Sequence, residues 1–214
     1  MKCYDIPGGE DSEFEPGSGG KVLRNLLGVT DVRLMELLES RYLVTAQERF
    51  YEKFENEHRF TFRDLRDMHR EWLGPIYPFA GTIRTVNIGK GGFQFATVQF
   101  LESNLKVFER DFLQALTPCR PSSLRGLSDA LAKVHGEFIM LHPFREGNGR
   151  LGRWLADVMA AQAGLPFPSY GFTEKDNSGR RVQYLSAVKK AALTNYEDLS
   201  RFFYEALLRG LEEA

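Results

Sequence analysis

The sequence predicts one mostly α-helical domain that carries a single β-hairpin. Apolar residues recur every three or four positions over several long stretches, which is the period of a helix. Only one stretch has the β-branched and aromatic residues typical of strands, and clusters of Gly and Pro separate the stretches. The chain has 214 residues, of which 43% are hydrophobic and 27% charged, as expected for one well-buried globular domain.

The start of the chain differs in composition from the rest. The first 20 residues are rich in Gly, Pro, Glu and Ser. We therefore expect residues 1–29 to form an extended N-terminal lead-in and residues 30–214 to form the domain. No apolar leader segment and no run of membrane-spanning length is present. Together with only two cysteines, this predicts a cytoplasmic protein without disulfides.

Helix boundaries can be predicted from capping residues. Thr30 and Asp31 offer an N-cap for a first helix, and Thr61 with Asp64 forms a capping box for a second. Residues 81–97 are the hairpin candidate, with Gly-Lys-Gly-Gly as its turn. A further helix begins near Val98, and three more are expected near residues 151–159, 178–192 and 195–211. The clearest apolar stripe predicts a long helix and consists of Leu124, Leu127, Leu131, Val134, Phe138 and Leu141.

The segment LHPFREGNGRLGRW at residues 141–154 brings together groups that suit phosphate chemistry. Pro143 ends the preceding helix and leaves His142 at its end, where the imidazole can accept a proton. A glycine-rich turn that opens the next helix is an anion site, and two arginines three residues apart suit phosphate oxygens. Glu146 lies among these positive groups, which indicates a hard cation such as Mg²⁺ between it and a phosphate.

Each of these features alone has a simpler explanation. A lone histidine is more often structural than catalytic, Gly-Asn-Gly is usually a turn, and paired arginines usually form a solvated helix face. Phe144 is expected to be a core anchor under the loop. The conjunction of all these groups within twelve residues favours a nucleotide site. The net charge of −1 gives no basic field, so neither nucleic acid nor a membrane surface is an expected partner.

Residues 142–153, HPFREGNGRLGR, resemble in full the signature of the Fic family, H-P-F-x-[DE]-G-N-G-R-x-x-R. The resemblance extends over about residues 20–210. YPFAGTIRTVNIGKGGFQFA at 77–96 resembles the family's flap hairpin, and RRVQYLSAVKKAALTNYEDLSRF at 180–202 resembles its closing helices. The family implies a helical core with a β-hairpin flap and the transfer of AMP from ATP to a hydroxyl of a target protein.

The resemblance also implies roles for individual residues. His142 would be the general base, and Glu146 would hold Mg²⁺ against the α- and β-phosphates. Asn148 would contact the α-phosphate, Arg150 the β- and γ-phosphates, and Arg153 the γ-phosphate end. The residues implied to bind phosphates are Gly147, Asn148, Gly149, Arg150 and Arg153. The residues implied for the flap, which would register a target strand on the hairpin at 83–96, are Lys90, Gly91, Gly92 and Phe93. Tyr184 is expected to line the adenine pocket.

Regulation is predicted from a motif that the sequence lacks. Many Fic proteins carry an inhibitory helix with the pattern [ST]-x-x-x-E-[GN], whose glutamate pairs with the second signature arginine. No Ser or Thr of this chain is followed by that pattern, and Thr194 with Asp198 comes nearest to it. We therefore expect a toxin-like enzyme inhibited in trans by a small antitoxin protein. An inhibitory segment within residues 1–30 is the alternative.

Other functions remain open at this point. In the death-on-curing branch of the family, which phosphorylates its target, a larger basic residue replaces the last signature glycine, so Gly149 favours AMP transfer. Another branch moves phosphocholine, and the donor could differ from ATP. A nucleotide-binding pseudoenzyme is disfavoured by the intact His142 and Glu146. A metal hydrolase using these two residues as ligands is disfavoured because Pro143 breaks the helix between them.

Overall fold

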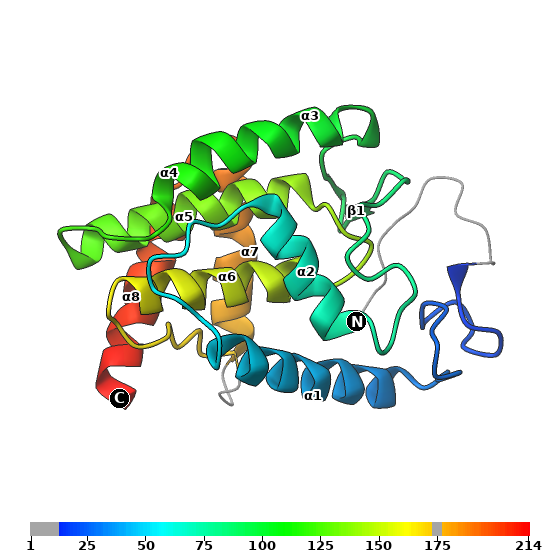
Figure 1. Cartoon of the computed structure of the whole chain (residues 1–214). Helices are drawn as coiled ribbons and strands as arrows, with labels where there is room; N and C mark the ends of the chain where they lie inside the picture. The colour runs from blue at the N-terminus through cyan, green and yellow to red at the C-terminus, as the bar shows by residue number, and fades with distance from the viewer. Residues whose placement is uncertain (1–12, 173–176) are drawn as a thin grey trace.

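The computed structural model describes residues 13–172 and 177–214, and it confirms a mostly helical fold with one small hairpin. Figure 1 shows α5 and α6 through the middle of the molecule, α1 along one side, and α3 with α4 along the other. The elements in chain order are α1 (Val32–Tyr51), α2 (Phe62–Leu73), β1 (Gly89–Lys90), β2 (Phe93–Gln94), α3 (Val98–Phe108), the π-helical η2 (Glu109–Leu113), α4 (Gln114–Leu116), α5 (Leu124–Leu141), α6 (Asn148–Gln162), α7 (Asn177–Ala191) and α8 (Glu197–Glu213).

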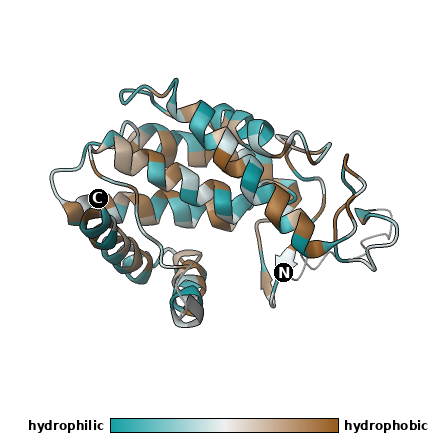
Figure 2. Cartoon of the chain, turned by 90° about the horizontal axis from the view of Figure 1, so that it is seen from below, coloured by the Kyte–Doolittle hydropathy of each residue, from teal (hydrophilic) through white to brown (hydrophobic). Residues whose placement is uncertain are grey.

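Helix α5 is the centre of the core, packed against α3, α6, α7 and α8. Its predicted stripe is buried from Leu127 to Leu141, and Leu124 is partly covered. Figure 2 shows apolar and polar residues on different faces of the helices, as burial of one face requires. Each fully buried Leu or Phe contributes roughly 1.5–3 kcal/mol to folding. The stripe therefore fixes where α5 ends, and with it the loop that begins at His142.

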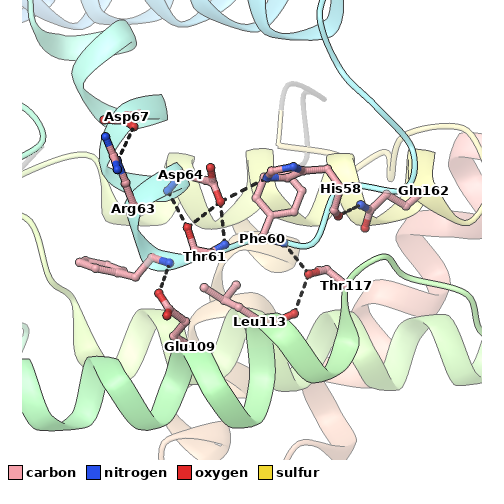
Figure 3. Close-up of polar contacts among 11 residues, drawn as sticks. His58, Phe60, Thr61, Arg63, Asp64, Asp67, Glu109, Leu113, Thr117 and Gln162 are labelled. Carbon is pink, nitrogen blue, oxygen red and sulfur yellow. Dashed lines mark hydrogen bonds and ion pairs between the residues drawn. The ribbon is translucent and has the colours of Figure 1, made fainter.

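The predicted caps hold α1 and α2 in place. Asp31 accepts a hydrogen bond from the Leu34 amide at 2.8 Å and starts α1. Thr61 and Asp64 form the reciprocal capping box at the start of α2. The Glu109 carboxylate of η2 also accepts from the Phe62 amide at 2.7 Å. Figure 3 shows Glu109 and Thr61 near each other at the start of α2. Because its first turn is bonded on two sides, α2 is firmly placed beside the loop that follows α5.

The hairpin is shorter than the sequence predicted. The strands have two residues each, with Gly89 opposite Gln94 and Lys90 opposite Phe93. The turn is Gly91–Gly92, both at positive φ, so the predicted four-residue turn was wrong by two positions. The rest of residues 81–97 is irregular, and the Arg84 guanidinium donates to the Val86 and Ala96 carbonyls within it.

The described part of the lead-in packs on the domain. Phe14 pairs with Leu23 in an isolated β-bridge, and Val22 and Leu23 are buried in the core. Arg145, in the loop after α5, forms an ion pair with Glu13 at 2.8 Å. Residues 1–12 lie outside the described residues, so the domain boundary at residue 30 stays a prediction. Across the described ranges, no helix is both long and apolar enough to cross a membrane.

Candidate functional site

His142 is the C-cap of α5 and adopts a left-handed backbone, with φ 47° and ψ 57°. Its amide donates to the Phe138 carbonyl at 3.0 Å, and Pro143 prevents the helix from continuing. A left-handed conformation costs a residue with a Cβ roughly 1–2 kcal/mol. Contacts around the loop must therefore hold His142 in place, as expected where geometry serves a function.

The imidazole of His142 is buried and oriented. Nδ1 lies 2.9 Å from the Ile139 carbonyl, which can only accept, so Nδ1 carries the proton and Nε2 carries the lone pair. The Phe95 ring stacks on the imidazole with a centroid distance of 3.6 Å. The pKa of His142 is lowered to about 3, chiefly by burial and in smaller part by the charges of Arg84 and Lys90, against the bond to Ile139, which raises it. The residue is therefore a neutral base at pH 7.

The predicted anion site is the N-terminal end of α6. Gly147 is its N-cap at φ 83°, and a Cβ there would lie 2.9 Å from Cζ3 of Trp72. Glycine is therefore required at this position for both conformation and space. A Cβ at Gly149 would meet only Nη1 of Arg153 within 4 Å, at 3.7 Å. The first-turn amides and the positive end of the helix dipole give this end its affinity for anions.

The Asn148 side chain closes the loop. It is fully buried, Oδ1 accepts from the Phe144 amide at 2.9 Å, and Nδ2 donates to the Phe144 carbonyl at 2.7 Å. Its expected contact with the α-phosphate stays a prediction, since these bonds use Oδ1 and only one of the two N–H donors of Nδ2. The main-chain amide remains at the anion site. Phe144 is the predicted core anchor, with its ring stacked on His69 at 4.0 Å.

The Arg150 guanidinium lies between two carboxylates, an arrangement that the sequence did not predict. Its Nη2 is 2.7 Å from Oε2 of Glu39 on α1 and 3.7 Å from Oε1 of Glu146, and its guanidinium lies over the Trp72 ring. Glu39 is buried and also accepts from the Tyr77 hydroxyl at 2.6 Å. A signal for Glu39 was present, since it falls on the helical stripe of Met35, Tyr42 and Ala46.

The Glu146 carboxylate is suited to a cation that is held mainly by the phosphates of a bound substrate. Its carboxylate is partly exposed and accepts from the Gly147 amide at 2.9 Å. Within the described ranges, no three or more His, Cys, Asp or Glu side chains gather to form a metal cage. One accessible carboxylate beside an anion site is the donor set that Mg²⁺ uses with phosphate oxygens.

Arg153 is held by aromatic residues. Its guanidinium lies over the rings of Phe172 and Tyr170. It is also close enough to the Tyr184 hydroxyl for its charge to oppose the burial that raises the pKa of Tyr184. Tyr184 is buried, and its hydroxyl is 2.8 Å from Nε2 of His135. Tyr184 therefore supports Arg153 in this structure, and its role in an adenine pocket stays a prediction.

The hairpin lies beside His142. Lys90 is close enough for its charge to lower the pKa of His142. Phe93 contacts Phe95 edge to face at 5.4 Å, and Phe95 in turn covers the imidazole. The turn glycines, Gly91 and Gly92, are exposed. The structure thus brings the hairpin and the loop after α5 together, as predicted.

A separate hollow of about 400 Å³ lies between the end of α1, α2 and α6. Its lining includes Phe50, His58, Asp64 and Trp154, and it contains none of the predicted site residues. Two pairs of charged or titratable side chains on its walls are in contact, Arg49 with Glu71 at 3.0 Å and His58 with Asp64 at 3.2 Å. The hollow and the predicted site residues therefore lie in different places. We assign the candidate site to the residues around His142 because of their chemistry.

Comparison with known proteins gives relatives of this chain. The Fic/DOC family model matches residues 59–160. The chain is 33% identical over 171 residues to protein adenylyltransferase VbhT of Bartonella schoenbuchensis, covering 77% of this chain and 33% of that protein. It is 31% identical over 108 residues to the probable protein adenylyltransferase y4lH of Sinorhizobium fredii, covering 48% of this chain and 54% of that protein. The chain thus spans between a third and about half of these relatives.

The fold of the chain also resembles that of a solved structure. The crystal structure of the BepC protein of Bartonella tribocorum, determined with bound AMPPNP, superposes with a TM-score of 0.71 at 19% identity. The superposition covers 92% of this chain and 98% of BepC. The complete signature at residues 142–153, the hairpin beside it and the matched segment agree, and the chain belongs to the Fic/DOC family.

Proposed function

We propose that this domain transfers AMP from ATP to a hydroxyl side chain of a protein. The observation that carries the proposal is a neutral imidazole, oriented by Ile139 and Phe95, at the end of α5 where the glycine-rich start of α6 forms an anion site. Two of the relatives are named as protein adenylyltransferases, one of them as probable, which supports the same chemistry.

The reaction uses these groups as follows. The hydroxyl oxygen of the target attacks the α-phosphorus, the bond to the β-phosphate oxygen breaks, and pyrophosphate leaves. Nε2 of His142 takes the hydroxyl proton. The first-turn amides of α6 bind the phosphate oxygens, and Arg150 and Arg153 bind toward the β- and γ-phosphates. Mg²⁺ held at Glu146 would neutralise phosphate charge.

Nucleotide binding should also prepare the base. In the free domain the pKa of His142 is about 3, which makes the imidazole a weak proton acceptor. Phosphates bound near it add negative charge that stabilises the imidazolium and raises this pKa toward neutrality. Base strength would then depend on the occupied site. An NMR titration of His142 with and without AMPPNP measures this change.

Two labelled substrates test the reaction. Purified domain, Mg²⁺ and cell lysate are incubated with ATP labelled on the α-phosphate or on the γ-phosphate, with His142→Ala as control. We expect only the α-label to enter a protein band. Transfer of only the γ-label would assign phosphorylation, and nucleotide binding without either label would assign a binding module. Gly149 supports AMP transfer, because a basic side chain there would bring like charge toward Arg153.

We also propose that the protein is toxin-like and inhibited in trans by a small antitoxin protein. The support is the missing inhibitory pattern in the sequence, together with the surroundings of Arg153, whose guanidinium lies over two aromatic rings and near the Tyr184 hydroxyl and the buried Asp157. Expression of the chain alone should be toxic, and Arg153→Ala should remove the toxicity. Low activity that rises after trimming of residues 1–30 would instead assign inhibition within the chain.

A further inference from the structure

The side chain of Arg84 joins the hairpin to the end of α5. It is 4% exposed, and its main-chain amide donates to the Pro143 carbonyl at 2.9 Å. Its guanidinium donates only to main-chain carbonyls in the contacts that the structure gives. Nε donates to the His142 carbonyl at 2.7 Å, and Nη1 donates to the Val86 carbonyl at 2.7 Å. Nη2 donates to the Leu141 carbonyl at 3.2 Å and to the Ala96 carbonyl.

A buried guanidinium bound only to carbonyls needs an explanation. Within residues 13–172 and 177–214, no carboxylate lies within ion-pair distance of Arg84. Burying its charge costs free energy, and burial lowers the pKa of Arg84. The carbonyls at the end of α5 offset this cost, because the last turn of a helix has unpaired acceptors and the negative end of the helix dipole.

The contacts of Arg84 meet at the imidazole of His142. The guanidinium fixes the carbonyls of Leu141 and His142, which orients the left-handed residue itself. It also fixes the Ala96 carbonyl, next to Phe95, whose ring stacks on the imidazole at 3.6 Å. The Ala96 amide donates to the Met140 carbonyl at 3.0 Å and ties the same stem of the hairpin to α5.

We propose that Arg84 is a positioning residue that holds His142 and the Phe95 ring in register and so couples the hairpin to the base. This rests on the proposed function, in which His142 accepts the proton. The bond from Nδ1 to Ile139 fixes only the α5 side of the imidazole, whereas the Arg84 guanidinium binds carbonyls on the α5 side and on the hairpin side.

Electrostatics gives a readout that loss of packing would not change. After burial, the charges that lower the pKa of His142 come from Arg84 and Lys90, both on the hairpin side, while the Ile139 carbonyl on α5 acts in the opposite direction. Removing the charge of Arg84 should raise the pKa of His142 toward 6.5. Replacing Arg84 by Lys keeps the charge but removes the planar fork that reaches several carbonyls.

The experiment compares Arg84→Met and Arg84→Lys with a matched control, Arg66→Met. Arg66 also donates from Nε to a main-chain carbonyl, Gly81 O at 2.9 Å, at the foot of the same segment. For each variant, NMR gives the pKa and ring chemical shifts of His142, kinetics give kcat and KM for ATP, and a melting curve gives stability. The NMR measurement uses the free domain and needs no substrate.

For Arg84→Met we expect kcat to fall about 10- to 100-fold, as for misplaced catalytic groups, with KM for ATP within about threefold. The pKa of His142 should rise. Arg84→Lys should lose part of kcat, shift the ring signals and keep the low pKa. Arg66→Met should melt lower while the His142 signals and kcat stay near the parental values.

Unchanged His142 signals in Arg84→Met, or equal effects of Arg66→Met on kcat and on these signals, would overturn the proposal. If Arg84→Met does not fold, Arg84→Lys decides, since parental kcat and ring shifts in that variant would also overturn it. If the parental domain transfers no AMP, the proposed function fails, and the NMR comparison still decides whether Arg84 positions His142.

Discussion

Lowering the pH from 7 to 5 is expected to reduce the free energy of unfolding by about 3 kcal/mol, because buried histidines outweigh one buried carboxyl group. Burial lowers the pKa of His69 and His135 to about 4 and that of His142 to about 3. Below pH 6.5 the unfolded chain binds three protons at these residues that the folded chain rejects. The free energy of unfolding that these three histidines contribute therefore falls as the pH falls from 6.5 toward their folded-state pKa values.

Asp157 acts in the opposite direction. Burial raises its pKa to about 7, against the Tyr170 hydroxyl and the charge of Arg153, which lower it. The folded state then takes up a proton between pH 7 and 3.8 that the unfolded state does not, so acidification stabilises the fold there. From pH 7 to 5 the three histidines cost roughly 5–6 kcal/mol and Asp157 returns about 2 kcal/mol, which leaves the net loss of about 3.

Urea denaturation at pH 7, 6 and 5, followed by circular dichroism, measures this loss. In Asp157→Asn the loss of unfolding free energy from pH 7 to 5 should increase to about 5 kcal/mol. In His135→Gln the same loss should be roughly 2 kcal/mol smaller than in the parent. Each variant is compared with itself at two pH values, so its stability at pH 7 cancels. A flat parental profile between pH 6.5 and 5, or an Asp157→Asn profile equal to the parental one, would refute the argument from burial.

Three further outcomes test the site. His142→Ala should lower transfer about 10²- to 10⁴-fold and leave ATP affinity, measured by calorimetry, within about threefold, and a parental rate would remove its role as base. Gly147→Ala should lower the melting temperature because its Cβ meets Trp72, whereas Gly149→Ala should melt like the parent. Ile88→Lys should unfold the hairpin region because Ile88 is buried. Phe93→Lys should keep the parental melting temperature and lose target modification, because Phe93 is partly exposed. Equal losses of melting temperature in the two variants would contradict a docking role for Phe93.

Much of the fold could be predicted because its determinants are local. The stripe along α5, the capping box at Thr61 and the proline after His142 are all read within a few residues, and each has the expected effect in the structure. Residues 142–153 could be predicted for the same reason. A helix end, a glycine turn and a helix start follow one another along the chain, so sequence neighbours are also neighbours in the site.

The parts that could not be predicted depend on partners far apart in the sequence. Arg84, in the hairpin's own stem, binds carbonyls at the end of α5, and no local pattern reveals that preference. One missed contact is local: the Asn148 side chain, expected at a phosphate, also closes the loop through the amide and carbonyl of Phe144, four residues away.

Glu39 shows how a distant residue could still be inferred from sequence. It lies on the buried stripe of α1, outside the matched segment 59–160, and a carboxylate on such a stripe needs a cation or hydrogen-bond donors. The structure provides both, with Arg150 at 2.7 Å and the Tyr77 hydroxyl at 2.6 Å. An arginine expected to bind phosphate is thus already paired with a buried carboxylate on another helix. The charge that a nucleotide meets at Arg150 is consequently set by α1 as well as by the signature loop.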